Sequence, residues 1–226
     1  MSARRYDWVL FDLDETLFDF PANEALLALL EQIGLAPDEG LIGEYKRTNH
    51  ALWEQFNAGD IDSHSLQSRR FCTIGAAADR CPLELNRLFL EQIVAISRPL
   101  DGVLETLAQL RQAGVGMGII TNGFSAPQRG RLQRHELEHW FSPLVISDEV
   151  GVSKPRGEIF QHALAALPHI SRERVLMVGD NPQTDIGGAV AAGLATCWYD
   201  PHFNEALCQP THRIHHFSEL ANIVLG

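Results

Sequence analysis

The chain has 226 residues, of which 45% are hydrophobic and 21% are charged, and its formal net charge is −11. This length favours one core domain with an insertion, and the composition excludes collagen-like, disordered and membrane-spanning proteins. Because no run of Lys or Arg is longer than a pair, so acidic a chain is not expected to bind a nucleic-acid polymer, although a pocket for a small anion remains compatible with it.

The number and spacing of the cysteines and the amino-terminal segment indicate the cellular compartment in which the protein is expected. The four cysteines are Cys72, Cys81, Cys197 and Cys208, and no two of them form a Cys-x-x-Cys pair. A chain of this size needs no disulfide bond, so we expect reduced cysteines that mostly pack in the interior. The first apolar stretch ends at Asp12, too short for a secretory leader, and none approaches the roughly 18 residues of a membrane span. We therefore expect a cytoplasmic protein with no membrane partner.

The first hundred residues predict one strand followed by a helical block. The apolar run 8–11 breaks at Asp12 and is typical of a buried parallel strand. Apolar residues at helical spacing then predict helices over about 26–33, 41–56, 63–78 and 82–96, with Ser63 and Pro82 opening the last two. No strand pattern lies between residues 20 and 97, so this block is expected to be purely helical.

After Pro99 the pattern alternates between helix and strand. Strands are predicted at 115–120, 144–146, 174–178 and 195–199, with helices over 101–113 and 157–167, one after residue 123, and a small-residue one ending at Gly193. This alternation predicts an α/β fold with a parallel sheet covered by helices on both faces. The first strand must join that sheet, so the expected domains are a core of residues 1–17 and 98–226 and an inserted helical domain of residues 18–97.

Polar residues collect where the predicted strands end. Asp12 and Asp14 lie two apart on an extended segment and can face one pocket, where a carboxylate pair suits a hard cation and an acid–base role. The same residues could instead form a turn. Thr121 and the backbone N–H groups that follow it could bind an oxyanion, although Thr-Asn-Gly is also a good turn sequence.

The two remaining polar positions have structural alternatives as well. Lys154 precedes Pro155 in a loop, where a lysine is ordinarily a surface charge. Asp180 and Asp185 follow the strand at 174–178 and could complete a cation site. Alternatively, Thr184 and Asp185 could cap the next helix.

The order and placement of these groups are more specific than any one of them. The four motifs are Asp12-x-Asp14-x-Thr16, Thr121, Lys154 and Gly179-Asp180-(x4)-Asp185. They resemble the four motifs of the haloacid dehalogenase (HAD) superfamily of aspartate-nucleophile hydrolases, and the resemblance covers essentially the whole chain. It implies a Rossmann-like core with an all-helical cap inserted between the first and second motifs.

The resemblance also implies a metal-dependent phosphatase. Asp12 would attack phosphorus and form an aspartyl-phosphate. The implied cofactor is Mg²⁺, or Mn²⁺ in its place, bound by Asp12 and Asp180, with the backbone carbonyl of Asp14 as a further ligand and Asp185 acting partly through water. Haloacid dehalogenases need no metal and lack the second aspartate of the first motif. The presence of Asp14 and Asp180 therefore favours a phosphatase.

The other motif residues have implied roles in the same reaction. The Asp14 side chain would protonate the leaving oxygen and later activate water. Lys154 would neutralise the charge of Asp12 and the phosphate. Thr121, with the amides of Asn122 and Gly123, would bind the phosphoryl oxygens.

The framework is most similar to that of the bacterial pyrimidine 5′-nucleotidases, which hydrolyse UMP, dUMP and dTMP. The supporting stretches are Trp8, 11–18, 52–53, 70–71, 119–125, 145–147, 149–151 and 195–198. The expected partner is a small phosphorylated metabolite, a nucleoside monophosphate, and the expected assembly is a monomer or dimer. Two alternatives remain: a phosphatase for another small ester, such as a sugar phosphate or an acylneuraminate 9-phosphate, or a catalytically idle scaffold that binds a protein.

Substrate choice would depend on the helical domain, where the residues are less informative. Phe18, Trp53 and Phe56 could form an aromatic wall for a nucleobase, but helical spacing favours packing within the domain for the last two. Arg69 and Arg70 could reach a substrate oxygen, although exposed helix arginines are the commoner case. Neither group identifies the base.

Three histidines near the carboxyl terminus could be interpreted as a metal site. His212, His215 and His216 lie far along the chain from all four motifs. We therefore expect solvated histidines rather than metal ligands.

Overall fold

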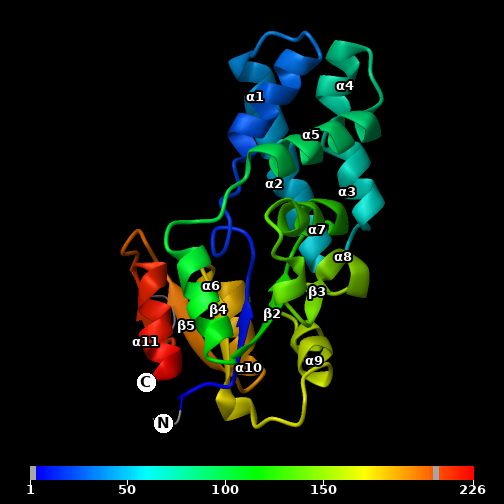
Figure 1. Ribbon diagram of the computed structural model, residues 1–226. Helices are drawn as coiled ribbons and strands as arrows, with labels where there is room; N and C mark the ends of the chain where they lie inside the picture. Colours follow the sequence, from blue (N-terminus) through cyan, green and yellow to red (C-terminus); the bar gives the residue numbers. More distant parts are fainter. Residues whose placement is uncertain (1–3, 206–208) are drawn as a thin grey trace. The chain divides into compact units, whose positions relative to one another are not determined.

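The computed structural model describes residues 4–205 and 209–226, so Cys208 lies outside the described residues. The chain divides into two compact units: residues up to Phe20 together with those from Arg98 onward, which we call the core unit, and Pro21–Ser97, the helical unit (Figure 1). The first division falls three residues after the expected boundary at 17. Within the described part of the chain, no helix has the length and apolarity needed to cross a membrane.

The core unit is built on a parallel sheet whose described strands number six. They are β1 (Trp8–Phe11), β2 (Gly116–Thr121), β3 (Leu144–Ile146), β4 (Val175–Gly179), β5 (Ala195–Tyr199) and β6 (His212–Ile214). The strand order is β3-β2-β1-β4-β5-β6, and every neighbouring pair is parallel. The predicted α/β fold is confirmed. Strand β6 was not predicted, because only one of its three residues is buried and no alternation marks it.

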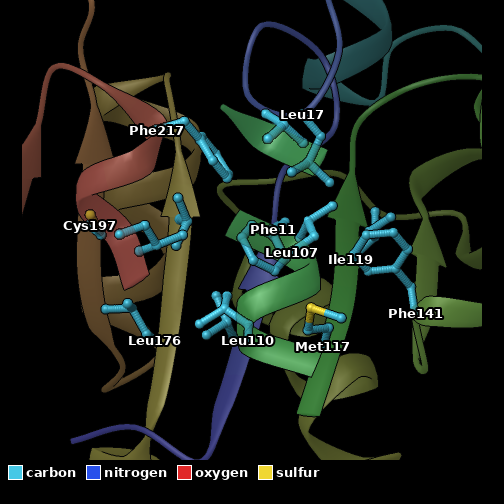
Figure 2. Close-up of a cluster of buried hydrophobic side chains, with 14 of the residues drawn as sticks. Phe11, Leu17, Leu107, Leu110, Met117, Ile119, Phe141, Leu176, Cys197 and Phe217 are labelled. Carbon is cyan, nitrogen blue, oxygen red and sulfur yellow. The ribbon is translucent and has the colours of Figure 1, made fainter. Parts of the chain in front are cut away.

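Alternate residues of the central strands enter two separate cores, one on each face of the sheet. Val9 and Phe11 join one cluster, whereas Leu10 joins the other. The first cluster lies under α6 (Val103–Gln112) and α11 (Leu220–Leu225), and Figure 2 shows its side chains around Phe11 and Leu107. The second lies under α9 (Gly157–Ala165) and α10 (Gly188–Ala191). The central strands are therefore buried on both faces, which is why they read as continuous apolar runs.

Short elements complete the core unit. They are α7 (Ser125–Arg134), α8 (Ser147–Val150), a π-helix η3 (Pro182–Gly187) and the 3₁₀ turns η1 (Glu138–Trp140), η2 (Arg172–Arg174) and η4 (Phe217–Glu219). Gly114, the predicted end of the helix before β2, has φ +70°, a conformation that glycine adopts without a steric penalty.

The helical unit contains five helices and no strand, and all of its residues are described. The helices are α1 (Ala22–Gln32), α2 (Glu39–Ala58), α3 (Ser63–Arg69), α4 (Cys72–Ala78) and α5 (Pro82–Ile96). Pro82 is the first residue of α5, as predicted. Asp62 rather than Ser63 caps α3, because its carboxylate accepts the Ser65 N–H at 2.7 Å.

The prediction of one helix over 63–78 is wrong, because the chain breaks at Arg70 and Phe71. Both side chains turn into the core of the helical unit. Arg70 Nε donates to Asn86 Oδ1 at 2.7 Å, and the Phe71 ring lies 4.9 Å from the ring of Tyr45 and 5.5 Å from that of Phe89. Arg70 is therefore buried rather than exposed, whereas Arg69 is exposed.

The cysteines follow the sequence prediction only in part. Cys197 lies on β5 and is completely buried, and burial raises the pKa of its thiol to about 12. Cys72 and Cys81 are exposed, which contradicts the expectation that the cysteines mostly pack in the interior. All three are free thiols.

Candidate active site

Three neighbouring strands deliver the candidate residues to one edge of the sheet. Asp12 directly follows β1, Thr121 ends β2, and Asp180 directly follows β4. Since β1 pairs in parallel with both β2 and β4, the carboxyl ends of the strands coincide. The Asp12 N–H continues the ladder by donating to Val178 O at 2.9 Å. The sheet therefore brings these side chains together although the chain separates them widely.

Lys154 is the buried centre of the site. Its Nζ lies 2.5 Å from Asp12 Oδ1 and 2.7 Å from Asp185 Oδ1, and it donates to the carbonyl of Ile120 at 2.8 Å. The Lys154 side chain is only 2% exposed, so the alternative of a solvated surface lysine is wrong. All three donor positions of the ammonium are thus used inside the protein.

Three carboxylates form a cluster beside that ammonium. Asp12, Asp180 and Asp185 each offer an oxygen, and these oxygens lie within 4.8 Å of one another. Three negative charges against the one positive charge of Lys154 leave a formal charge of −2. Hard carboxylate oxygens are the ligands that Mg²⁺ prefers. The donor set and its charge therefore fit a divalent cation.

Burial and the excess of negative charge together shift the pKa values of these groups. Burial raises the pKa of Asp12 well above its usual range, repulsion from Asp185 and Asp180 adds to this, and Lys154 opposes it. Burial, with repulsion from Asp185, also raises the pKa of Asp180 to about 7. For Lys154, burial alone would lower the pKa, but the Asp12 and Asp185 carboxylates outweigh it and the pKa is raised. A bound cation would relieve this repulsion.

Asp185 points into the cluster because another residue caps the helix that carries it. Asn181 Oδ1 accepts the N–H groups of Gln183 and Thr184, each at 3.0 Å, so the alternative in which Thr184 and Asp185 cap the helix is wrong. The Asn181 N–H in turn donates to Asp185 Oδ2 at 3.0 Å. A Cβ at Gly179 would lie 2.3 Å from the same oxygen, so only glycine fits there.

Two further side chains fix Asp180. The Asp180 N–H donates to Thr16 Oγ1 at 3.0 Å, and the Thr16 hydroxyl lies 3.3 Å from Asp180 Oδ1. Trp198 Nε1 donates to the carbonyl of Asp180 at 2.8 Å. Thr16 belongs to the first sequence motif, but the sequence assigned no role to its side chain. It assigned no role to Trp198 either.

The Asp14 side chain does not share the cluster with Asp12. Its carboxylate contacts α7 instead, where Gln128 Nε2 donates to Oδ2 at 3.1 Å and the Arg131 guanidinium pairs with Oδ1. The expectation that the two side chains face one cation assumed an extended segment. The chain instead turns after Asp12, with the Leu17 N–H donating to Leu13 O at 3.0 Å, so the two-residue alternation does not extend to Asp14.

At the end of β2 and in the segment after it, side chains make most of the hydrogen bonds that bear on the site. Thr121 Oγ1 is buried and accepts from Gln128 Nε2 at 2.9 Å. The Asn122 side chain holds the backbone of Lys154, accepting its N–H at 2.8 Å and donating to its carbonyl at 3.0 Å. The Gly123 N–H donates to Ser147 Oγ at 3.0 Å, so it would reach a phosphoryl oxygen only by giving up that bond.

The aromatic candidates lie in different surroundings. Phe18 is fully buried in the core unit and has no surface to offer a nucleobase, so its assignment to an aromatic wall is wrong. Trp53 and Phe56 are half-buried on α2, with ring centroids 5.6 Å apart in an edge-on contact. That contact agrees with the packing alternative for this pair.

The carboxyl-terminal histidines make local contacts, not a metal cluster within the described residues. His212 Nε2 lies 2.8 Å from the Tyr6 hydroxyl, and His215 Nδ1 lies 2.6 Å from the carbonyl of Asp200. The His216 N–H donates to Glu219 at 2.7 Å. The first two histidines are half-buried, so the expectation of solvated side chains is wrong for them.

Comparisons with known proteins give matches that span most of the chain. The family model of the haloacid dehalogenase-like hydrolases matches residues 6–193. Pyrimidine 5′-nucleotidase YjjG of Escherichia coli (strain K12) is 40% identical over 89% of this chain and 89% of its own length. Pyrimidine 5′-nucleotidase PynA of Streptococcus pneumoniae is 31% identical over 95% of this chain and 93% of its own length. A crystal structure of YfnB from Bacillus subtilis bound to magnesium is similar with a TM-score of 0.85, at 29% identity, over 98% of this chain and 99% of that one.

Proposed function

Because the chain belongs to the haloacid dehalogenase-like hydrolases, we propose that it hydrolyses a phosphomonoester with Asp12 as the nucleophile and that its substrate is a pyrimidine nucleoside 5′-monophosphate. The observation that carries the proposal is the contact of Lys154 with Asp12 and Asp185 beside Asp180. A buried ammonium among three carboxylates is costly to build for stability alone, because each buried ion loses hydration. Perturbed, partnered groups at the edge of an α/β sheet are typical of a catalytic site.

Asp12, Asp180 and Asp185 would hold the metal, with the backbone carbonyl of Asp14 as a further ligand. Mg²⁺ is the proposed ion and Mn²⁺ the alternative. When bound, it supplies positive charge that lets a carboxylate approach a phosphate dianion, a pair that would otherwise repel by about 4 kcal/mol at ~4 Å and an effective dielectric constant of ~20.

In the first step Asp12 takes the phosphoryl group. Lys154 binds Oδ1 of Asp12, which leaves Oδ2 as the atom that attacks phosphorus. The bond from phosphorus to the ester oxygen breaks, and that oxygen leaves with a proton from the Asp14 carboxyl group. The products of this step are the free nucleoside, an aspartyl-phosphate on Asp12 and an ionised Asp14.

In the second step water removes the phosphoryl group. Asp14 takes a proton from a water molecule as the water oxygen attacks phosphorus. The bond between phosphorus and Asp12 breaks, releasing inorganic phosphate and restoring the Asp12 carboxylate. Thr121 and the backbone N–H of Asn122 would donate hydrogen bonds to the phosphoryl oxygens in both steps.

The choice of a pyrimidine nucleotide rests on the relatives. YjjG and PynA carry that activity in their names and match this chain nearly end to end. The framework similarity found in the sequence supports the same branch. A sugar phosphate or an acylneuraminate 9-phosphate would use the same catalytic residues.

The test is phosphate release from a panel of phosphomonoesters with Mg²⁺ and with EDTA. The panel contains UMP, dUMP, dTMP, purine nucleotides and sugar phosphates. We expect metal-dependent release that is fastest with the pyrimidine nucleotides. Preference for a sugar phosphate would overturn the proposed pyrimidine nucleotide substrate. The absence of phosphate release from every compound would overturn the phosphatase assignment.

A variant pair tests the nucleophile. Asp12→Asn should lower turnover by at least about 10³-fold while keeping the circular dichroism spectrum, because an amide oxygen is a poor nucleophile. Asp38→Asn is the control, since Asp38 is an exposed cap of α2 and asparagine caps equally well. Normal turnover in Asp12→Asn would refute the mechanism.

A further inference from the structure

Two buried side chains on α7 connect the groups that the mechanism uses. Gln128 is 2% exposed and Arg131 is fully buried. They lie three residues apart, so both are on the same face of the helix. Neither belongs to the carboxylate cluster, and neither lies in one of the four sequence motifs.

The Gln128 amide bridges Asp14 and Thr121. Its Nε2 donates to Asp14 Oδ2 at 3.1 Å and to Thr121 Oγ1 at 2.9 Å. Its Oε1 accepts from the Arg131 guanidinium. Because arginine can only donate, this contact requires the amide oxygen to face Arg131 and the NH₂ group to face Asp14 and Thr121. One amide thereby sets the distance between the proposed acid–base group and the proposed phosphoryl-binding hydroxyl.

Arg131 holds the other oxygen of Asp14 and is itself held from several sides. Its guanidinium pairs with Asp14 Oδ1 and approaches the carbonyls of Pro127 at 3.4 Å and Asp19 at 3.5 Å. It also lies 5.7 Å from the ring centroid of Phe18. With no exposed surface, Arg131 has no route to a substrate, so its effect on the reaction must pass through Asp14 and Gln128.

We propose that Gln128 and Arg131 are positioning residues that orient the Asp14 carboxylate for its two proton transfers, with Thr121 Oγ1 as a second anchor of the Gln128 amide; this rests on the proposed function. Thr121 Oγ1 accepts from Gln128, so its own proton points elsewhere and can be donated to a phosphoryl oxygen. Both oxygens of Asp14 have a donor from α7, which restricts the rotation of the carboxylate. Such restriction matters because a displacement of about 1 Å can cost about 10²-fold in rate.

The test variants are Gln128→Met, which keeps the size of the side chain and removes both donors, and Arg131→Lys, which keeps the charge and removes the planar fork. Arg129→Gln is the matched control. Arg129 lies on the same helix but pairs with Glu138 and Glu149, away from Asp14. Should Arg131→Lys fail to fold, Gln128→Met carries the test alone.

The readout separates the two proton transfers. p-Nitrophenyl phosphate has a leaving group that needs no proton, whereas an alkyl phosphate does. With p-nitrophenyl phosphate, Gln128→Met should release one equivalent of nitrophenolate in a burst near the wild-type rate and then turn over ~10²-fold more slowly, since water attack needs Asp14. With the alkyl phosphate the first step should also slow, without a burst, and KM should change by less than about 3-fold.

A double variant decides whether the effect passes through Asp14. If it does, adding Gln128→Met to Asp14→Asn should cost less than about 2-fold further in kcat. Losses that multiply would overturn the proposal, as would an equal effect of Arg129→Gln. A wild-type protein that hydrolyses no phosphomonoester would overturn the proposed function itself, whereas an active wild type with multiplying losses overturns only the positioning role.

Discussion

Removing the Lys154 ammonium tests whether the site is an electrostatically coupled buried unit. In Lys154→Met the apolar stem is kept, but Asp12 and Asp185 lose a partner that lies 2.5 and 2.7 Å away. Breaking a buried ion pair from one side costs about 3–5 kcal/mol, because the remaining charge stays buried and uncompensated. For a chain of this size, each kcal/mol shifts Tm by roughly 2–4 °C. We therefore expect a Tm about 6–20 °C below that of the wild type.

The assay is thermal unfolding followed by circular dichroism near neutral pH in EDTA. The chain contains one other lysine, Lys46, which is exposed on α2, so Lys46→Met is the matched control and should leave Tm unchanged within about 2 °C. Raising the salt concentration should not shrink the Lys154→Met difference, because buried charges are screened little. A Tm within about 2 °C of wild type, or a difference that salt abolishes, would refute the buried-pair reasoning.

Three further predictions concern the same edge of the sheet. Because the pKa of Asp180 is raised from 3.8 to about 7, the metal-free protein binds more protons folded than unfolded, and its free energy of unfolding should fall as pH rises from about 4 to about 7, by up to ~4 kcal/mol. Denaturant titrations in EDTA measure how the free energy of unfolding changes with pH. An unchanged pH dependence in Asp180→Asn would show that Asp180 is not the group responsible. Gly179→Ala should displace Asp185 and cost about 1–3 kcal/mol, with a higher Mg²⁺ requirement in the phosphatase assay. An unchanged Mg²⁺ requirement would contradict the crowding at Asp185. In Asp14→Asn, a phosphoenzyme formed from p-nitrophenyl phosphate should persist longer than in the wild type, as mass spectrometry of quenched samples would show, and decay at the wild-type rate would exclude Asp14 as the base.

The sheet could be predicted because its signal is local. Apolar runs such as 8–11 and 144–146 coincide with β1 and β3, since strands buried on both faces need apolar residues at every position. The break at Arg70 and Phe71 could not be predicted in this way. It depends on rings and amides from α2 and α5 that receive the two side chains.

The candidate site likewise contains residues that could be predicted from the sequence and residues that could not. Asp12 and Asp180 could be named because each directly follows a strand, and parallel strands end at one edge of the sheet. The role of Asn122 could not be named from the sequence. Its side chain holds the backbone of Lys154, which is 32 positions further along the chain, and a Thr-Asn-Gly sequence serves equally well as a turn.

The sequence by itself determined the α/β class, the helical insertion and the acidic and basic groups of the site, because each depends on short-range pattern or on strand order. Only the tertiary structure decided where those groups point. Asp14 turns to Arg131, 117 positions away, and Lys154 reaches Asp12, 142 positions away. The physical reason is that orientation is set by whichever donor or charge close packing places beside a side chain, and that neighbour comes from a distant part of the chain.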